Sequence, residues 1–101
     1  MEKVLSITAE ELHRKMNCGE DILILDVRNE TDYNDWKIEG KKVRSMNIPY
    51  FNFLEEDEQV YAGLPKDTEI VVVCAKGGAS DYVAEMLMEK GYKTWSLKGG
   101  M

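Results

Sequence analysis

The sequence predicts an α/β protein with a parallel sheet covered by helices on both faces. Two continuous apolar runs, Ile22–Leu25 and Ile70–Val73, are typical of strands buried on both faces. Segments with helical patterns, residues 9–16 and 80–90, alternate with these strands, and this alternation is typical of β-α-β units. At 101 residues, we expect a single domain, residues 1–101, with one core.

The N-terminal half has clear helix boundaries. Thr8 and Glu11 form a capping-box pattern that predicts a helix over residues 9–16, and Gly19 suits the turn that follows it. The other elements expected in this half are a strand over 4–7, a strand over 22–25 that ends at 26–28, a helix over 30–36 with Tyr33 and Trp36 facing the core, a basic loop over 41–44 and a strand over 45–48.

The C-terminal half contains the strand that leads to the candidate site. In order, we expect a helical or irregular segment over 50–54, a solvated acidic run over 55–58, a turn over 64–67, a strand over 69–73, a helix over 80–90 and a last strand over 93–97. Val83, Met86 and Leu87 form an apolar stripe that predicts packing of the last helix on the core. Gly91 suits the end of that helix.

Charge and hydropathy exclude several classes of partner. The net charge of −6 argues against binding to nucleic acid or an anionic membrane, since both need basic patches. No apolar stretch approaches the roughly 20 residues of a membrane span, and the first residues lack a secretory signal core. We therefore expect a cytoplasmic protein in which Cys18 and Cys74 are free thiols. With a single histidine, His13, we expect neither a bound metal nor a cofactor.

Cys74 is the candidate catalytic residue. It ends a buried strand and begins the loop Ala75, Lys76, Gly77, Gly78 and Ala79, after which a helix is predicted to open at Ser80. The unpaired N–H groups at a helix N-terminus favour the thiolate, which is the nucleophilic form of cysteine. Glycines allow successive amides to turn inward around an anion, and Lys76 adds a positive charge. This pattern predicts a sulfur nucleophile that binds an anionic substrate.

A simpler interpretation of Cys74 is a buried cysteine before an ordinary turn, because free cysteine is among the most buried residue types. The glycine pair, the lysine and the helix start favour the functional interpretation. Cys18, in the polar turn 17–20, has no such surroundings, and we interpret it as incidental.

Several segments together resemble the rhodanese-like domain family over nearly the whole chain. They are residues 24–28 followed by Asp32 and Tyr33, Asn47–Pro49, Val72–Cys74 with its six-residue loop, the Gly91-Tyr92 turn, and residues 97–101. The resemblance implies a five-stranded, mostly parallel sheet flanked by helices. It also implies a sulfurtransferase in which Cys74 takes sulfane sulfur from a donor, thiosulfate or a persulfide, and passes it to a thiol or cyanide. Amides of residues 75–79 would cradle the outer sulfur.

The same resemblance implies supporting roles for Asp26, Arg28 and Asp32. Arg28 resembles a buried family arginine, and we interpret it as a structural partner of Asp32 or Glu30. Ala79 departs from the family, since many members have an arginine at this loop position, so recognition of an anionic donor falls on Lys76.

Other departures concern the surroundings of the domain. Trp36-Lys37-Ile38 replaces a glycine-histidine-isoleucine motif, and the stretch 40–47 is longer than usual. This variant resembles rhodanese modules joined to metallo-β-lactamase-type hydrolase or persulfide dioxygenase domains, which implies a fused or separate domain of that type as partner. The family's last helical segment is missing after Met101, so the chain is expected to be a domain excised from a longer protein.

Two other functions fit parts of the pattern. A phosphatase or arsenate reductase needs a cysteine, then five residues, then an arginine that clamps the oxyanion. Counted from Cys74, the arginine position is occupied by Ser80, which argues against this function. The alternative is a non-catalytic binding or regulatory module, or a persulfide carrier attached to a hydrolase domain. Inactive members of the resembled family often lack the cysteine, whereas this chain keeps it together with a loop lysine. Sulfur transfer through Cys74 by covalent catalysis is therefore the leading hypothesis.

Overall fold

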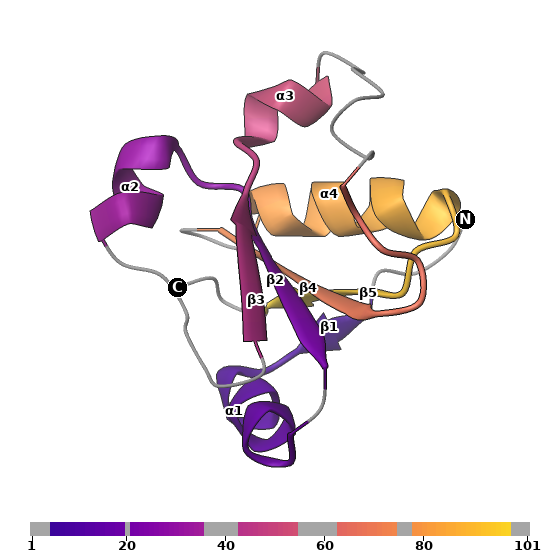
Figure 1. Ribbon diagram of the computed structural model, residues 1–101. Helices are drawn as coiled ribbons and strands as arrows, with labels where there is room; N and C mark the ends of the chain where they lie inside the picture. Colours follow the sequence, from indigo (N-terminus) through magenta and orange to yellow (C-terminus); the bar gives the residue numbers. More distant parts are fainter. Residues whose placement is uncertain (1–4, 20, 36–42, 55–62, 75–77, 98–101) are drawn as a thin grey trace.

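The computed structural model describes residues 5–19, 21–35, 43–54, 63–74 and 78–97. Its strands are β1 (Ser6–Ile7), β2 (Ile22–Asp26), β3 (Val43–Asn47), β4 (Glu69–Val73) and β5 (Thr94–Leu97). Its helices are α1 (Ala9–Asn17), α2 (Glu30–Asp35), α3 (Tyr50–Leu54) and α4 (Gly78–Glu89). The predicted alternation of strands and helices is confirmed (Figure 1).

The strands form one five-stranded sheet in the order β1-β5-β4-β2-β3. Every pairing recorded between these strands is parallel, so the predicted sheet is confirmed. β4 lies at the centre, and β2 is beside it. The chain leaves β2 towards β3 on one side and leaves β4 towards β5 on the other. In α/β sheets ligands bind at such a switch point, beyond the carboxyl ends of the strands.

Helices cover both faces of the sheet, as predicted. On one face, Leu12 of α1 packs with the apolar residues of one buried cluster: Ile7, Ile22, Ile24, Val71, Val73 and Leu97. On the other face, α3 and α4 contribute Phe53, Val83, Ala84 and Leu87 to a cluster with Leu23, Leu25, Ile70 and Val72. Alternate residues of β2 and β4 therefore face opposite clusters, which explains their continuous apolar sequence.

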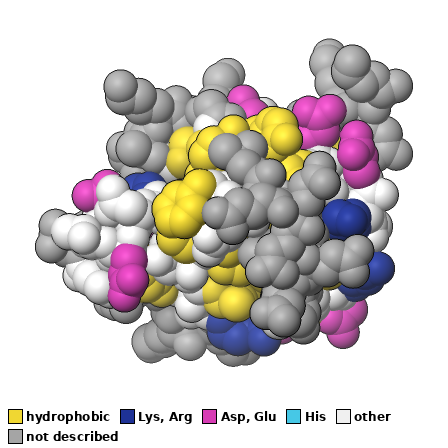
Figure 2. All heavy atoms as spheres, turned by 90° about the horizontal axis from the view of Figure 1, so that it is seen from above, with side chains coloured by type: hydrophobic (Ala, Val, Ile, Leu, Met, Phe, Trp, Pro, Cys, Tyr) yellow, Lys and Arg dark blue, Asp and Glu magenta, His cyan; other side chains and the backbone are white. Residues whose placement is uncertain are grey.

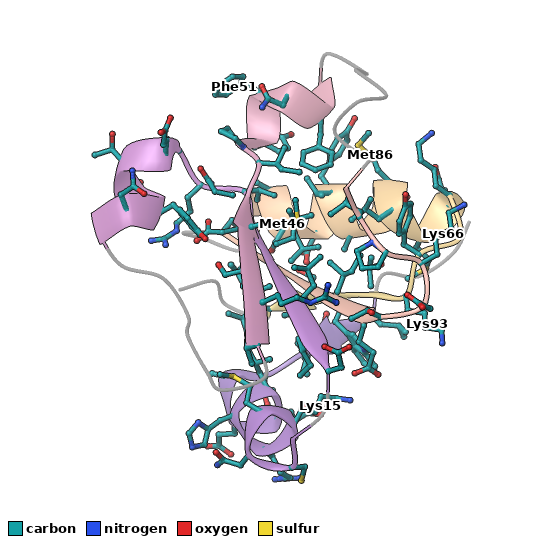
Figure 3. The ribbon with its side chains drawn as sticks, in the orientation of Figure 1. Lys15, Met46, Phe51, Lys66, Met86 and Lys93 are labelled. Carbon is teal, nitrogen blue, oxygen red and sulfur yellow. The ribbon has the colours of Figure 1, made fainter. Side chains whose placement is uncertain are left out.

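Met46 and Met86 extend the cluster beneath α3 and α4. They are half-buried and pack against it, Met46 from β3 and Met86 from α4 (Figure 3). Lys15 of α1 forms an ion pair with Glu69 at 3.2 Å, and its ammonium lies 5.4 Å from the centre of the Trp95 ring. These contacts attach α1 to β4 and β5.

Local sequence signals explain the helix ends. The Thr8 hydroxyl accepts from the Glu11 amide at 3.1 Å, and the Glu11 carboxylate accepts from the Thr8 amide at 3.3 Å, so the capping box is confirmed. Gly19 and Gly91 follow α1 and α4 with φ of 78° and 93°. Glycine adopts this left-handed conformation without the strain that a Cβ would cause.

Three boundaries differ from the sequence prediction by more than one residue. α4 begins at Gly78 rather than at Ser80, and β3 begins at Val43, so Val43 and Arg44 belong to a strand instead of a basic loop. β1 is limited to Ser6–Ile7 within the described residues. Strand pairing decides the start of β3, because β3 continues for as long as its partner β2 is present beside it.

Tyr33 and Trp36 were expected to face the core. Tyr33 is half-buried, and its hydroxyl forms a 2.7 Å hydrogen bond with Ser45 of β3. This bond holds α2 beside the β3 edge of the sheet. Trp36 and the acidic run 55–58 lie outside the described residues.

Candidate active site

Cys74 directly follows the central strand, at the carboxyl edge of the sheet. It is buried, with 4% of its surface exposed. Burial alone would suit an inert core cysteine. The sulfur, however, also accepts a hydrogen bond, because the amide N–H of Ser80 points at Cys74 Sγ over an N···S distance of 3.4 Å. Ser80 is the third residue of α4, so this amide is one of those that a helix leaves without an intrahelical acceptor.

The predicted loop is described only in part. Ala75, Lys76 and Gly77 lie outside the described residues. Gly78 opens α4, and Ala79 follows it, half-buried against the cluster under α3 and α4. The predicted contribution of residues 75–79 to a cradle for sulfur therefore stays a prediction, while Ser80 places a further amide at the sulfur.

Ser80 is also held by its side chain. Its hydroxyl lies 2.9 Å from that of Ser96 on β5, and the Ser96 hydroxyl donates to the carboxylate of Asp81. Both serines are fully buried. Neither Ser96 nor Asp81 is among the site residues predicted from the sequence. The signal available in the sequence was a serine, Ser96, between the apolar residues Trp95 and Leu97 of the last predicted strand.

Asp26 and Arg28 lie at the same edge of the sheet as Cys74. Asp26 is paired in register with Val73, the residue before the cysteine, and the Val27 amide donates to the Val73 carbonyl at 2.9 Å. The Arg28 guanidinium binds the Asp26 carboxylate through two nitrogens, with a shortest distance of 2.7 Å. The backbone amide of Arg28 donates to the same carboxylate at 2.9 Å.

The partner of Arg28 differs from the sequence interpretation, which named Asp32 or Glu30. Asp26 is the ion-pair partner that the structure records, because a side chain two residues back along an extended segment can fold onto the guanidinium. The hydrogen bond to Asp26, with the charges of Asp26 and Asp32, raises the pKa of Arg28 against the opposing effect of burial. Asp32 is exposed on α2, where its amide donates to Asn29 Oδ1 at 2.8 Å.

Asn47, the last residue of β3, binds the turn that contains Asp26 and Arg28. Its side-chain amide donates to the carbonyls of Asp26 and Arg28 at 3.0 and 2.9 Å. The turn after β2 is therefore attached to both neighbouring strands. In the sequence, Asn47 is only part of a segment that resembles the family, and no such role is predicted for it.

The outer face of α3 and α4 carries aromatic side chains. Hydrophobic side chains gather across the face seen from above in Figure 2, the side that α3 and α4 cover. Phe51 points away from α3 (Figure 3) and is 57% exposed, and Tyr82 of α4 is 45% exposed. The rings of Tyr50 and Tyr82 pack edge to face with centres 5.8 Å apart.

Other kinds of site find little support in the described ranges. No three His, Cys, Asp or Glu side chains there lie close enough together to hold a metal ion. None of the helices in those ranges is long and apolar enough to span a membrane. Cys18 is an exposed free cysteine at the end of α1, and Cys74 is a buried free cysteine.

Comparisons with known proteins give relatives with sulfur-transfer names. The chain is 33% identical over 81 residues to a tRNA sulfurtransferase of Desulfurococcus amylolyticus, covering 80% of this chain and 14% of the relative. It is 26% identical over 99 residues to a sulfurtransferase of Allochromatium vinosum, covering 97% of this chain and 85% of the relative. The first of these relatives is thus a much longer protein.

A solved structure agrees in fold. The NAD-dependent persulfide reductase from A. fulgidus is 37% identical, with a TM-score of 0.68 over 97% of this chain and 15% of that one. The family model for the rhodanese-like domain matches residues 8–101. Because that match includes β2 to β5, the helices α1 to α4 and the Cys74 segment, the chain belongs to the rhodanese-like domain family.

Proposed function

We propose that this domain is a sulfurtransferase in which Cys74 carries the transferred sulfur as a persulfide. The observation that carries the proposal is the hydrogen bond from the first turn of α4 to Cys74 Sγ, at the switch point of the sheet. Fixed N–H dipoles aimed at sulfur stabilise negative charge there. Sulfurtransferase relatives of low identity support the reaction class.

The proposed reaction has two displacement steps. In the first, the Cys74 thiolate attacks the sulfane sulfur of thiosulfate or of a persulfide. The S–S bond of the donor breaks, its electron pair leaves with sulfite or with the donor thiolate, and Cys74 becomes a persulfide. In the second, an acceptor thiolate or cyanide attacks the outer sulfur, and the electron pair of the broken S–S bond returns to Cys74. No electrons are gained or lost overall.

The supporting groups divide into two sets. Amides of residues 75–79, with that of Ser80, would stabilise the charge on the outer sulfur, and Lys76 would bind an anionic donor. Asp26 and Arg28 would hold the turn beside Cys74 without touching the reacting atoms. We place the reaction in the cytoplasm, whose reducing conditions keep thiols free for catalysis.

Intact mass spectrometry tests the proposal directly. The chain is incubated with thiosulfate, and separately with a low-molecular-weight persulfide, and we expect one added sulfur atom that cyanide removes. Cys74→Ser should prevent the addition and abolish turnover, and the matched variant Cys18→Ser should retain both. Sulfur on Cys18, or no addition with either donor, would show that the assignment is wrong.

A second candidate is a persulfide carrier that serves another domain. The small share that this chain spans of its longer relatives favours it, because in such proteins the domain is one part of a larger chain. The partner would be a metallo-β-lactamase-type domain, as the sequence resemblance implies. In this case Cys74 would take up sulfur in the mass experiment but turn over slowly with free thiols or cyanide.

A further inference from the structure

A chain of hydrogen bonds connects the surface of α4 to the amide that binds Cys74. Asp81 accepts from the Ser96 hydroxyl, which lies 2.9 Å from the Ser80 hydroxyl, and the Ser80 amide donates to Cys74 Sγ at 3.4 Å. Ser80 and Ser96 are fully buried, while Asp81 is exposed. One residue, Ser80, therefore joins the sulfur contact to the side-chain contacts.

The direction of these bonds follows from the number of protons available. A carboxylate accepts only, so the single hydroxyl proton of Ser96 goes to Asp81. Ser96 must then accept from Ser80 through its oxygen. The bond thus sets the side-chain rotamer of Ser80, and the position of Asp81 sets the orientation of Ser96.

The hydrogen bonds among Asp81, Ser96 and Ser80 form a brace, and the register of the sheet places this brace near Cys74. Ser96 on β5 is paired with Val72 on β4, two residues before Cys74. Ser96, which holds α4, and the strand that leads directly into Cys74 are thus on adjacent, directly paired strands. The first turn of α4 is tied to the same part of the sheet that carries the sulfur.

We infer that Asp81 and Ser96 are positioning residues that keep the Ser80 amide aimed at Cys74 Sγ, an inference that rests on the proposed function. They act on the sulfur through Ser80. Other charged groups recorded at this edge in the described chain are Asp26, the last residue of β2, and Arg28 in the turn after it, which pair with each other. α3 presents the Tyr50 ring against Tyr82.

The first test compares two buried hydroxyls of β5 that both bind α4. Ser96→Ala removes the brace near the sulfur. Thr94→Val is the matched control, because the Thr94 hydroxyl donates to the Ala84 carbonyl at 3.0 Å, farther along the same helix. We expect Ser96→Ala to raise the pH midpoint of Cys74 alkylation by iodoacetamide by about half a unit. Its sulfur-transfer rate near neutral pH should fall about threefold. Thr94→Val should change neither.

The second test uses the exposed end of the brace, where folding is least at risk. Asp81→Asn and Asp81→Ala both remove the charge, but the asparagine oxygen can still accept from Ser96. We expect a higher alkylation midpoint for Asp81→Ala than for Asp81→Asn. This difference measures the hydrogen bond apart from the charge.

Equal midpoints for the two Asp81 variants, or equal shifts for Ser96→Ala and Thr94→Val, would overturn the inference. The alkylation comparison does not depend on sulfur transfer. Failure of the parent chain to accept sulfur would therefore count against the proposed function, and failure of the alkylation differences would count against the positioning roles.

Discussion

At the scale of single residues, Cys74 lies at the same edge of the apolar sheet as the ion pair of Asp26 and Arg28. Asp26 is nearly fully buried, and its carboxylate accepts from the backbone amide and the guanidinium of Arg28. Burying such a pair costs desolvation free energy, and removing one partner typically costs about 3–5 kcal/mol because the other charge is left unpaired. The pair holds the turn after β2 against the residue that precedes Cys74.

Lys76 is the residue on which recognition of an anionic donor depends in the proposed mechanism. Replacing it with alanine should raise the KM for thiosulfate roughly tenfold or more, because a charge-assisted hydrogen bond contributes about 1.5–3 kcal/mol. The KM for an uncharged donor should change much less. Steady-state kinetics with both donors measures the difference.

Lys93→Ala is the control for this experiment. Lys93 is exposed and precedes β5, so it lies at the amino edge of the parallel sheet, opposite Cys74. It should leave both KM values unchanged. Equal losses with charged and uncharged donors in Lys76→Ala would show that Lys76 has a structural role instead.

At the scale of the elements, helix ends determine much of the local structure. α4 starts two residues earlier than its sequence pattern predicted, which places Ser80 within the first turn. Its amide is one of the first-turn amides of α4, and it donates to Cys74 Sγ. α1, by contrast, starts where its capping box predicted, because both halves of the box are local interactions.

The capping box of α1 supports a prediction on stability. Thr8→Ala should lower the free energy of unfolding by about 1 kcal/mol, since the Glu11 amide loses its acceptor. Urea denaturation followed by circular dichroism measures the change. The nearby exposed Ser6→Ala should stay within about 0.5 kcal/mol of the parent. α1 covers the face of the sheet opposite α4. A change in the rate of Cys74 alkylation in folded Thr8→Ala would therefore contradict the statement that Thr8 acts only as the cap of α1.

At the scale of the whole molecule, β2 and β4 belong to both buried clusters. Val71 and Val73 face α1, while Ile70 and Val72 face α3 and α4. A strand cannot lose its packing on one face and keep its position on the other. The two clusters should therefore unfold together.

Leu12→Ala tests this cooperativity. Leu12 is the buried residue of α1, and its truncation should lower the free energy of unfolding by about 2–5 kcal/mol. Circular dichroism should show a lower urea midpoint, and hydrogen exchange of the amides of α4, on the opposite face of the sheet, should show the same midpoint. Exchange in α4 that keeps the parent midpoint would mean that the two faces unfold independently.

The sequence by itself determined the α/β class, the order of the elements, the buried strands and the choice of Cys74. These depend on short-range patterns: apolar runs, the Thr8–Glu11 box, and glycines after helices. The order of the strands, the pairing of Arg28 with Asp26 and the contact of Ser96 with Ser80 depend on the tertiary structure. Ser80 and Ser96 are 16 residues apart, and only the pairing of β4 with β5 beneath α4 brings them together, because no local pattern encodes which strands become neighbours.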